Sequence, residues 1–134
     1  MVSDELRALA TGGNFATLTT LLPDGRPAAQ VMWVDCDDEH VLINTELHRQ
    51  KFKNVEGDRR VVVCIWDRDD PYHYVEVRGE VVEVVRGDPA RHHIDELAMR
   101  YFGRLYDGES IQSERVILRI RPDGSPKEHG GKGH

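Results

Sequence analysis

The segment from Tyr72 to Val85, YHYVEVRGEVVEVV, restricts the fold more than any other part of this sequence. Valines and polar residues alternate along it, which is the two-residue period of a strand with one buried face. Val81 and Val82 break the alternation, and Gly79 comes just before them. A change of face beside a glycine indicates a β-bulge or a bend. The sequence therefore predicts one long strand that serves two parts of a curved sheet.

Five further segments have the composition of strands. They are NFATLTTL (14–21), PAAQVMWVD (27–35), HVLINT (40–45), RRVVVCIWD (59–67) and ERVILRIRP (114–122). The turn signal PDGR joins the first two into a hairpin. The run 59–67 is apolar on both faces, so we expect it at the centre of the sheet. Six mostly antiparallel strands favour a small closed or nearly closed barrel, because closure removes the exposed edges of the sheet.

Three helices are expected around this barrel. The first follows the N-cap Ser3, the second covers residues 46–56, and the third follows the N-cap Asp88 with Pro89 in its first turn. The chain has 134 residues, which is enough for one domain and too few for a second core. We expect the domain to span residues 1–122. The Gly-rich polar stretch 123–134 is predicted to be a disordered tail.

Charge and composition exclude several classes of function. The formal net charge is -6, so a broad basic surface for nucleic acid is not expected. No apolar run is long enough to span a bilayer, and the first 13 residues lack the pattern of a signal peptide. The expected location is therefore the cytoplasm, without membrane insertion. Cys36 and Cys64 form no CxxC motif, and we expect neither a disulfide nor a nucleophile from them.

Cations are concentrated in one stretch, Thr45 to Arg60, of this acidic protein. Five of its sixteen residues are basic: Arg49, Lys51, Lys53, Arg59 and Arg60. Two interpretations compete, a solvated helix face or a seat for an anionic ligand. Positive charges near a helix start are unfavourable by roughly 0.3–1 kcal/mol each. An anion bound by the free N–H groups of the first turn would reverse this cost.

The helical phase of the basic stretch leaves its geometry open. In a helix over residues 46–56, Arg49 and Lys53 share a face, whereas Lys51 points well away from both. Either the first turn is irregular, or the cations bind a ligand with anionic groups at more than one place. Asn44 and Thr45 are the expected caps of this helix.

Other side chains give weaker indications of a site. His92, His93 and Glu96 lie together on a predicted helix, but no third or fourth ligand has usable spacing, so no metal site is predicted. Trp33 and Trp66 are core residues in the simplest interpretation. Beside an anion site, however, such aromatic side chains also form the walls that a flat ring system needs.

Several of these motifs occur in one family. The runs NTELHRQKFKNVEGDRRVVVCIWD and DPYHYVEVRGEVVEV are the most specific in combination, and ATLTTLLPDGRPAAQVMW and HIDELAMRYFG support them. Over most of its length the chain resembles the flavin and deazaflavin oxidoreductases of the pyridoxamine 5′-phosphate oxidase-like split β-barrel superfamily. The branch that uses coenzyme F420, an 8-hydroxy-5-deazaflavin, is the most similar.

The resemblance implies a homodimeric six-stranded antiparallel split β-barrel, mainly β with flanking helices, that binds its cofactor in a groove between subunits. The implied activity is hydride transfer between coenzyme F420 and a small organic substrate, such as a quinone-like or unsaturated acceptor. No catalytic residue is implied. The cofactor-binding residues carried over from the family are Gln30, Val31, Met32, Trp33, Asn44, Thr45, Arg49, Gln50, Lys51, Lys53, Trp66, Pro71, Tyr72 and Tyr74.

Within that set the roles differ. Residues 30–33 would line the ring system, and Asn44 and Thr45 would approach the ring or its side chain. Arg49, Gln50 and Lys51 would hold the phosphate. Lys53 would reach along an anionic tail. Trp66 and the segment 71–74 would come from the partner subunit.

Three alternatives stay open at the level of sequence. FMN also carries a phosphate, so an FMN-dependent enzyme of the same fold fits the Arg49 and Lys51 site. A carrier that holds flavin, deazaflavin or haem without turnover is the second alternative, and a nucleic-acid module is a distant third. Pyridoxamine phosphate oxidation is not expected, because ILRIRP is followed by a Gly-rich segment instead of the C-terminal Trp and Arg that grip pyridoxal phosphate.

Overall fold

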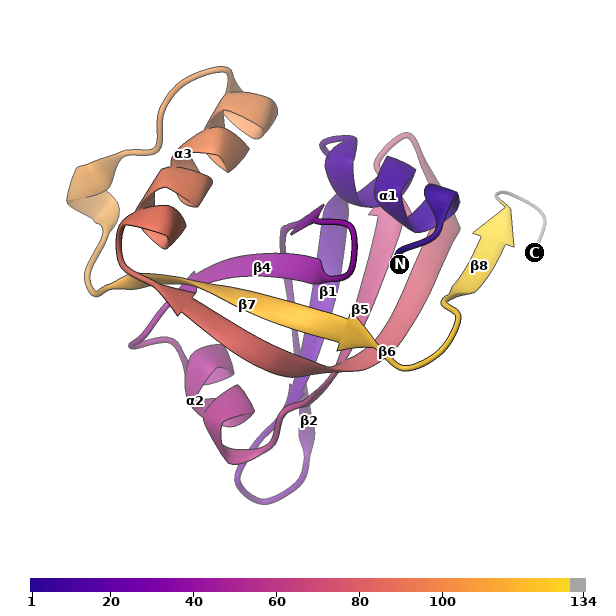
Figure 1. Ribbon diagram of the computed structural model, residues 1–134, viewed down its shortest axis with the longest axis horizontal. Helices are drawn as coiled ribbons and strands as arrows, with labels where there is room; N and C mark the ends of the chain where they lie inside the picture. The colour runs from indigo at the N-terminus through magenta and orange to yellow at the C-terminus, as the bar shows by residue number, and fades with distance from the viewer. Residues whose placement is uncertain (131–134) are drawn as a thin grey trace.

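In the described part of the chain, eight strands form a single antiparallel sheet that curls around the hydrophobic core (Figure 1). The computed structural model describes residues 1–130. Hydrogen-bonded neighbours follow the order β2-β1-β5-β6-β7-β4-β3, and β8 pairs with β6 beside this path. The strands are β1 (Phe15–Leu21), β2 (Pro27–Trp33), β3 (Asp35–Cys36), β4 (Val41–Glu46), β5 (Arg60–Asp67), β6 (Asp70–Arg86), β7 (Arg115–Pro122) and β8 (Lys127–Gly130).

The long strand β6 has the bend that its sequence predicts. The register between β6 and β7 shifts between Val81 and Glu83, so the valine pattern changes face at this point. A Cβ atom on Gly79 would lie 2.2 Å from the carbonyl oxygen of Arg121, which explains why a residue without a side chain is needed there. The prediction of one strand that serves two parts of a curved sheet is confirmed.

Two short strands were not expected, because the sequence predicts six. β3 has only two residues and pairs with the start of β4. β8 lies inside the predicted tail, where Lys127–Gly130 pair with residues 73–76 of β6. On that side of β6, β7 covers only residues 79–86, which leaves backbone groups of the first half for another strand. The prediction of disorder does not hold for these four residues, and residues 131–134 lie outside the described part of the chain.

Among residues 1–130, three α-helices cover the sheet, α1 (Asp4–Thr11), α2 (Gln50–Gly57) and α3 (Asp88–Phe102), and a short 3-10 helix, η1 (Gly108–Ser110), precedes β7. Figure 1 shows α1 and α2 at opposite ends of the curled sheet and α3 beside it, against β4 and β7. Ser3 caps α1 as predicted, since its hydroxyl accepts the N–H of Leu6 at 3.1 Å. The cap predicted for α3 is wrong by one residue, because Gly87 precedes the helix with φ 80° and Asp88 lies in the first turn.

The core lies inside the curl of the sheet. Alternate residues of β1, β5 and β6 point inward, and Leu6 and Leu9 of α1 close one end. Phe52 and Val55 of α2 pack against the same cluster from the other end. β2 buries little, and it lies at one edge of the sheet. Among the described residues, no helix is long and apolar enough to cross a membrane.

Candidate functional site

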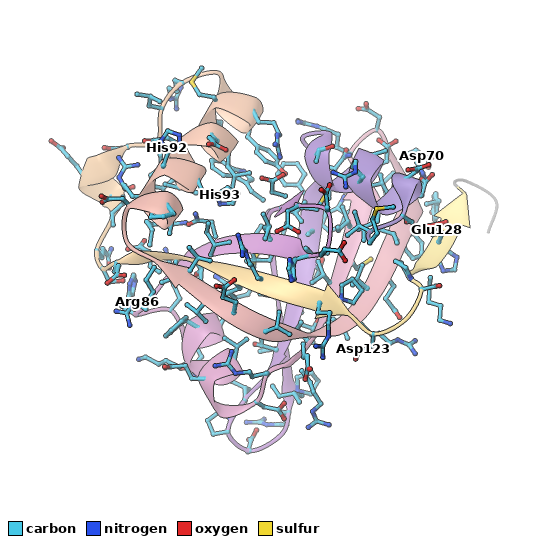
Figure 2. All side chains as sticks on the ribbon, viewed as in Figure 1. Asp70, Arg86, His92, His93, Asp123 and Glu128 are labelled. Carbon is cyan, nitrogen blue, oxygen red and sulfur yellow. The ribbon has the colours of Figure 1, made fainter. Side chains whose placement is uncertain are left out.

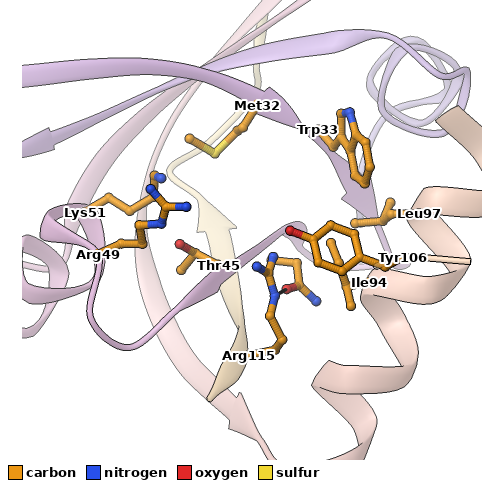
Figure 3. A pocket seen from close by; sticks show the side chains of 10 residues that line it. Met32, Trp33, Thr45, Arg49, Lys51, Ile94, Leu97, Tyr106 and Arg115 are labelled. Carbon is orange, nitrogen blue, oxygen red and sulfur yellow. Dashed lines mark hydrogen bonds between the residues drawn. The ribbon is translucent and has the colours of Figure 1, made fainter. Parts of the chain in front are cut away.

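A cavity of about 300 Å³ opens between β2, β4, the start of α2, α3 and the start of β7 (Figure 3). Its walls differ in chemistry. In Figure 3, Arg49 and Lys51 lie on one side, and Ile94, Leu97 and Tyr106 lie on the other. The lining residues are Met32, Trp33, Asn44, Thr45, Arg49, Lys51, Ile94, Leu97, Tyr106 and Arg115.

The basic side of the cavity depends on where α2 begins. The sequence predicts a helix from residue 46 capped by Asn44 and Thr45, and this is wrong, because both residues lie in β4. The helix begins at Gln50, and Arg49 occupies the N-cap position in an extended conformation, φ -71° and ψ 144°. With Arg49 outside the helix, its side chain and that of Lys51 can face the same cavity. The irregular first turn is therefore the alternative that the structure shows.

The first turn of α2 has the properties of an anion site. No side chain caps it, so its leading N–H groups have no partner within the helix. Neither Arg49 nor Lys51 forms an ion pair with any described residue. Burial lowers the pKa of Lys51, and the charges of Arg49 and Arg115 lower it further. Arg49 and Lys51 repel one another and neither has a carboxylate partner, so an anion in the cavity would relieve an unfavourable arrangement.

Arg115 is the third cation of the cavity, and the sequence did not point to it. It opens β7, is buried, and donates to Glu46 Oε2 at 3.2 Å and to Asn44 Oδ1 at 2.8 Å. Its guanidinium also lies 5.3 Å from the ring centre of Tyr106. Burial lowers the pKa of Arg115, which Glu46 partly opposes. Because Glu46 balances this charge, the excess positive charge comes from Arg49 and Lys51.

Glu46 is held in place by backbone groups. Its Oε1 accepts the N–H of Gln112 at 2.7 Å and that of Ser113 at 2.8 Å. Burial acts to raise the pKa of Glu46, but these hydrogen bonds and the charge of Arg115 give a net lowering. The carboxylate therefore stays ionised beside Arg115 and fixes that side chain at the cavity wall.

An aromatic wall stands opposite the basic turn. The ring of Trp33 stacks on Tyr101 with centres 4.8 Å apart and an angle of 7°. Phe102 meets Trp33 edge-on at 4.9 Å. The hydroxyl of Tyr101 accepts the N–H of Val34 at 3.2 Å and donates to the carbonyl of Asn14, which fixes the stack. Together with Met32, Trp33 gives the cavity an apolar surface suited to a flat ring.

The structure brings six of the predicted residues to the cavity: Met32, Trp33, Asn44, Thr45, Arg49 and Lys51. Asn44 lies in the wall, but its side chain is already engaged with Arg115, Ala90 and His93. Gln50 points elsewhere, because its amide donates to Asn54 Oδ1 at 2.7 Å. Lys53 lines a separate cavity beside the β1–β2 hairpin, together with Asp58 and Arg60.

The other predicted residues lie away from this cavity within one chain. Gln30 and Val31 are exposed on the edge strand β2. Trp66 packs near Phe15, with ring centres 6.4 Å apart. Pro71 and Tyr72 are exposed at the start of β6, and Tyr74 stacks on His129 at 4.4 Å.

Histidines and acidic residues show no metal-binding arrangement in the part of the chain that the structure describes, residues 1–130. His92 pairs with Glu96 at 3.2 Å on the exposed face of α3. His73 lies between Glu5 and Asp67, and the hydrogen bond to Glu5 raises the pKa of its imidazole.

Comparison with known proteins places this chain in a family. The sequence pattern that defines the family described as pyridoxamine 5′-phosphate oxidase matches residues 2–125. The chain belongs to this family. None of the curated proteins matches it.

Solved structures of the family's fold are similar over nearly the whole chain. An F420 reductase is 32% identical, with a TM-score of 0.79 over 92% of this chain and 97% of that one. A conserved hypothetical protein from Mycobacterium tuberculosis is 27% identical, with a TM-score of 0.72 over 96% and 86% of the two chains. A haem storage protein from Vibrio cholerae, 15% identical over 98% and 97%, has a TM-score of 0.70 and shares the fold.

Proposed function

We propose that the chain is an oxidoreductase that binds coenzyme F420 and transfers hydride between this cofactor and a small organic substrate, such as a quinone-like or unsaturated acceptor. The observation that carries the proposal is the pair Arg49 and Lys51, which face a cavity without a carboxylate partner and opposite the stacked Trp33. The 32% identity to an F420 reductase favours a deazaflavin over other phosphorylated ring systems.

The donor set fits a phosphorylated ring cofactor. Arg49 and Lys51 would hold the phosphate, with the free N–H groups at the start of α2 as further donors. Arg115 would add a third positive charge whose direction Glu46 fixes. Met32 and Trp33 would pack against the ring. When bound, the cofactor supplies the hydride chemistry, and the protein binds it, orients it and excludes water.

A second subunit is part of the proposal. A cavity of about 300 Å³ is at the lower limit of small-molecule sites, so one chain encloses only part of such a cofactor. The edge strand β2, which carries Met32 and Trp33, is also largely uncovered, and Val31 is 64% exposed. We propose that a homodimer covers this strand and completes the groove. Trp66, Pro71, Tyr72 and Tyr74 would then contribute from the partner subunit.

FMN is the second candidate cofactor, and the position of Lys53 supports it. The sequence suggested that Lys53 and Arg49 together would grip a long anionic tail, but Lys53 lines a different cavity. The phosphate site alone would serve either cofactor. Titration of the purified protein with each one distinguishes them. Quenching of deazaflavin fluorescence with micromolar affinity supports the proposal, whereas a yellow protein with a flavin spectrum would replace it with the FMN enzyme.

Turnover separates an enzyme from a carrier. The loaded protein is mixed with reduced cofactor and a panel of quinones and unsaturated lactones, and consumption of reduced cofactor is followed by absorbance. We expect consumption with at least one acceptor class. Tight cofactor binding without any turnover would instead identify a carrier protein.

A further inference from the structure

A buried polar network runs from α3 to the wall of the cavity. His93 is 7% exposed, and its Nε2 lies 3.0 Å from Asp35 Oδ2 while its Nδ1 lies 3.1 Å from Asn44 Nδ2. On the far side, Arg100 donates to Asp35 Oδ1 at 3.2 Å. On the near side, Asn44 accepts from Arg115 Nε at 2.8 Å. Asn44 and Arg115 both line the cavity, so the network ends where a ligand would bind.

The hydrogen bonds of the network admit one arrangement of protons. Arg115 can only donate, so the atom of Asn44 that faces it is the carbonyl oxygen. The amide nitrogen of Asn44 then donates to the carbonyl of Ala90 at 2.9 Å and to His93 Nδ1. His93 Nδ1 must therefore accept, and Nε2 must carry the proton that it donates to Asp35. His93 is a neutral imidazole in this arrangement.

We propose that neutral His93 is a positioning residue for the anion site, because it fixes the amide of Asn44, which in turn aims Arg115 into the cavity. The inference rests on the proposed function, in that the bound group is anionic, and it adds a regulatory property to that site. His93 does not line the cavity itself, so its effect on a ligand must pass through Asn44 and Arg115.

Protonation of His93 breaks this arrangement. An N–H at Nδ1 would face the N–H groups of Asn44, and turning the amide over would place those groups against Arg115. The charged groups around His93 are Asp35, which accepts from its Nε2, Arg100, which donates to Asp35, and Arg115, which donates to Asn44. Glu46 is the remaining carboxylate in contact with Arg115. Once His93 is protonated, Arg115 loses its hydrogen bond to Asn44, one of the two bonds that orient it, and anion binding weakens.

Three substitutions test the proposal, with sulfate as the probe because its charge is the same at pH 5 and pH 8. His93→Gln keeps an acceptor for Asn44 and a donor for Asp35 but cannot be protonated. His93→Leu removes both hydrogen bonds. His92→Gln is the matched control, since His92 is exposed on the other face of α3, as Figure 2 shows. Sulfate affinity is measured by NMR titration at both pH values.

At pH 8 we expect the wild type, His93→Gln and His92→Gln to bind sulfate equally. His93→Leu should bind sulfate about tenfold more weakly, because Arg115 is no longer held in place for its charged hydrogen bond to the anion. At pH 5 the wild type should bind several-fold more weakly than His93→Gln. Comparison at one pH removes the contribution of Lys51, whose charge both proteins share. Equal affinities of the wild type and His93→Gln at pH 5 would overturn the proposal.

The tautomer gives a readout that needs no ligand and no variant. Nitrogen-15 spectra of the wild type at pH 8 should show His93 with a proton on Nε2 and none on Nδ1. The opposite tautomer would overturn the proposal even if His93→Leu failed to fold. If the wild type binds neither sulfate nor cofactor, the proposed function fails. If His93 carries its proton on Nε2 but sulfate binding does not depend on pH, only the positioning role of His93 is refuted.

Discussion

Lys51 and Lys53 are two residues apart in α2 and serve as a matched pair at the residue scale. Lys51 is half-buried in the cavity with Arg49, and Lys53 is exposed on the side of the helix that faces the β1–β2 hairpin. Positions two apart on a helix point in different directions, so only one of the two lysines can contact a ligand in this cavity. Because the two lysines carry the same charge in different surroundings, comparing their variants shows whether the cavity binds the ligand.

Lys51→Ala should weaken binding of the phosphorylated cofactor by roughly 1.5–3 kcal/mol, because a charge-assisted hydrogen bond is lost. The measurement is a fluorescence titration of each purified variant. Lys53→Ala is the control, and its affinity should stay within about twofold of the wild type. Equal losses in the two variants would show that the cavity is not the phosphate site.

Asp35 makes the stability of the protein depend on acid pH. Burial acts to raise the pKa of its carboxyl, but the hydrogen bond from His93 and the charge of Arg100 give a net lowering. A lowered folded-state pKa contributes stability that is complete above the unfolded value, near 3.8, and is lost as pH falls through the folded value.

Asp35→Asn removes this contribution. The free energy of unfolding should fall less steeply below about pH 4 in the variant than in the wild type, whereas the wild type should be the more stable protein at neutral pH. Urea unfolding at a series of pH values provides the measurement. Parallel curves for both proteins would show that the carboxylate does not titrate differently in the folded state.

Local sequence patterns predicted much of the site. Residues that reach the site through the pairing of distant strands could not be predicted in this way. Arg49 and Lys51 follow a strand directly, and Trp33 ends another, so local patterns indicated both. Arg115 reaches the cavity because β7 pairs with β4, which sets Arg115 opposite Glu46. Arg115 and Tyr106 carry no local signal of this role, since the residues that bring them to the cavity, Glu46 and Asn44 for Arg115 and Trp33 for Tyr106, lie more than fifty residues away.

At the scale of elements, the bend of β6 depends on close approach of two backbones. A Cβ atom on Gly79 would meet the carbonyl oxygen of Arg121 at 2.2 Å, and neither backbone can move without disturbing the β6–β7 pairing. We expect Gly79→Ala to destabilise the fold by about 1–3 kcal/mol. Gly57→Ala is the control, because no atom lies within 4 Å of the new Cβ atom.

Thermal and urea unfolding of the two variants test this prediction. Gly57→Ala should be neutral or slightly stabilising, since alanine reduces the freedom of the unfolded chain. If Gly79→Ala were as stable as the wild type, the two strands would have to separate at the bend, and the explanation of the register shift would be wrong.

The alternation of apolar and polar residues in the sequence was enough to predict most of the elements. The predictions failed where contacts between distant segments determine the structure. The alternation of β6 and the turn PDGR are local properties, and both elements formed as predicted. The start of α2 was predicted four residues too early, because Glu46 pairs with Arg115 in the sheet and so extends β4. β8 was missed, since a Gly-rich polar segment forms a strand here only because β6 offers it an edge.

For the whole molecule, the uncovered strand β2 connects the proposed dimer with the proposed cofactor site. Val31 is 64% exposed on the strand that carries Met32 and Trp33 to the cavity. Val31→Glu should dissociate the dimer at low micromolar concentration, because an unpaired charge would be buried between the subunits. Cofactor affinity should fall with it, since the partner completes the groove. Sedimentation velocity and fluorescence titration on the same samples measure both quantities.

Val82→Glu, at a valine 39% exposed on β6, is the control and should leave both the dimer and the cofactor affinity unchanged. A monomeric Val31→Glu variant with full affinity would separate assembly from binding and confine the site to one chain.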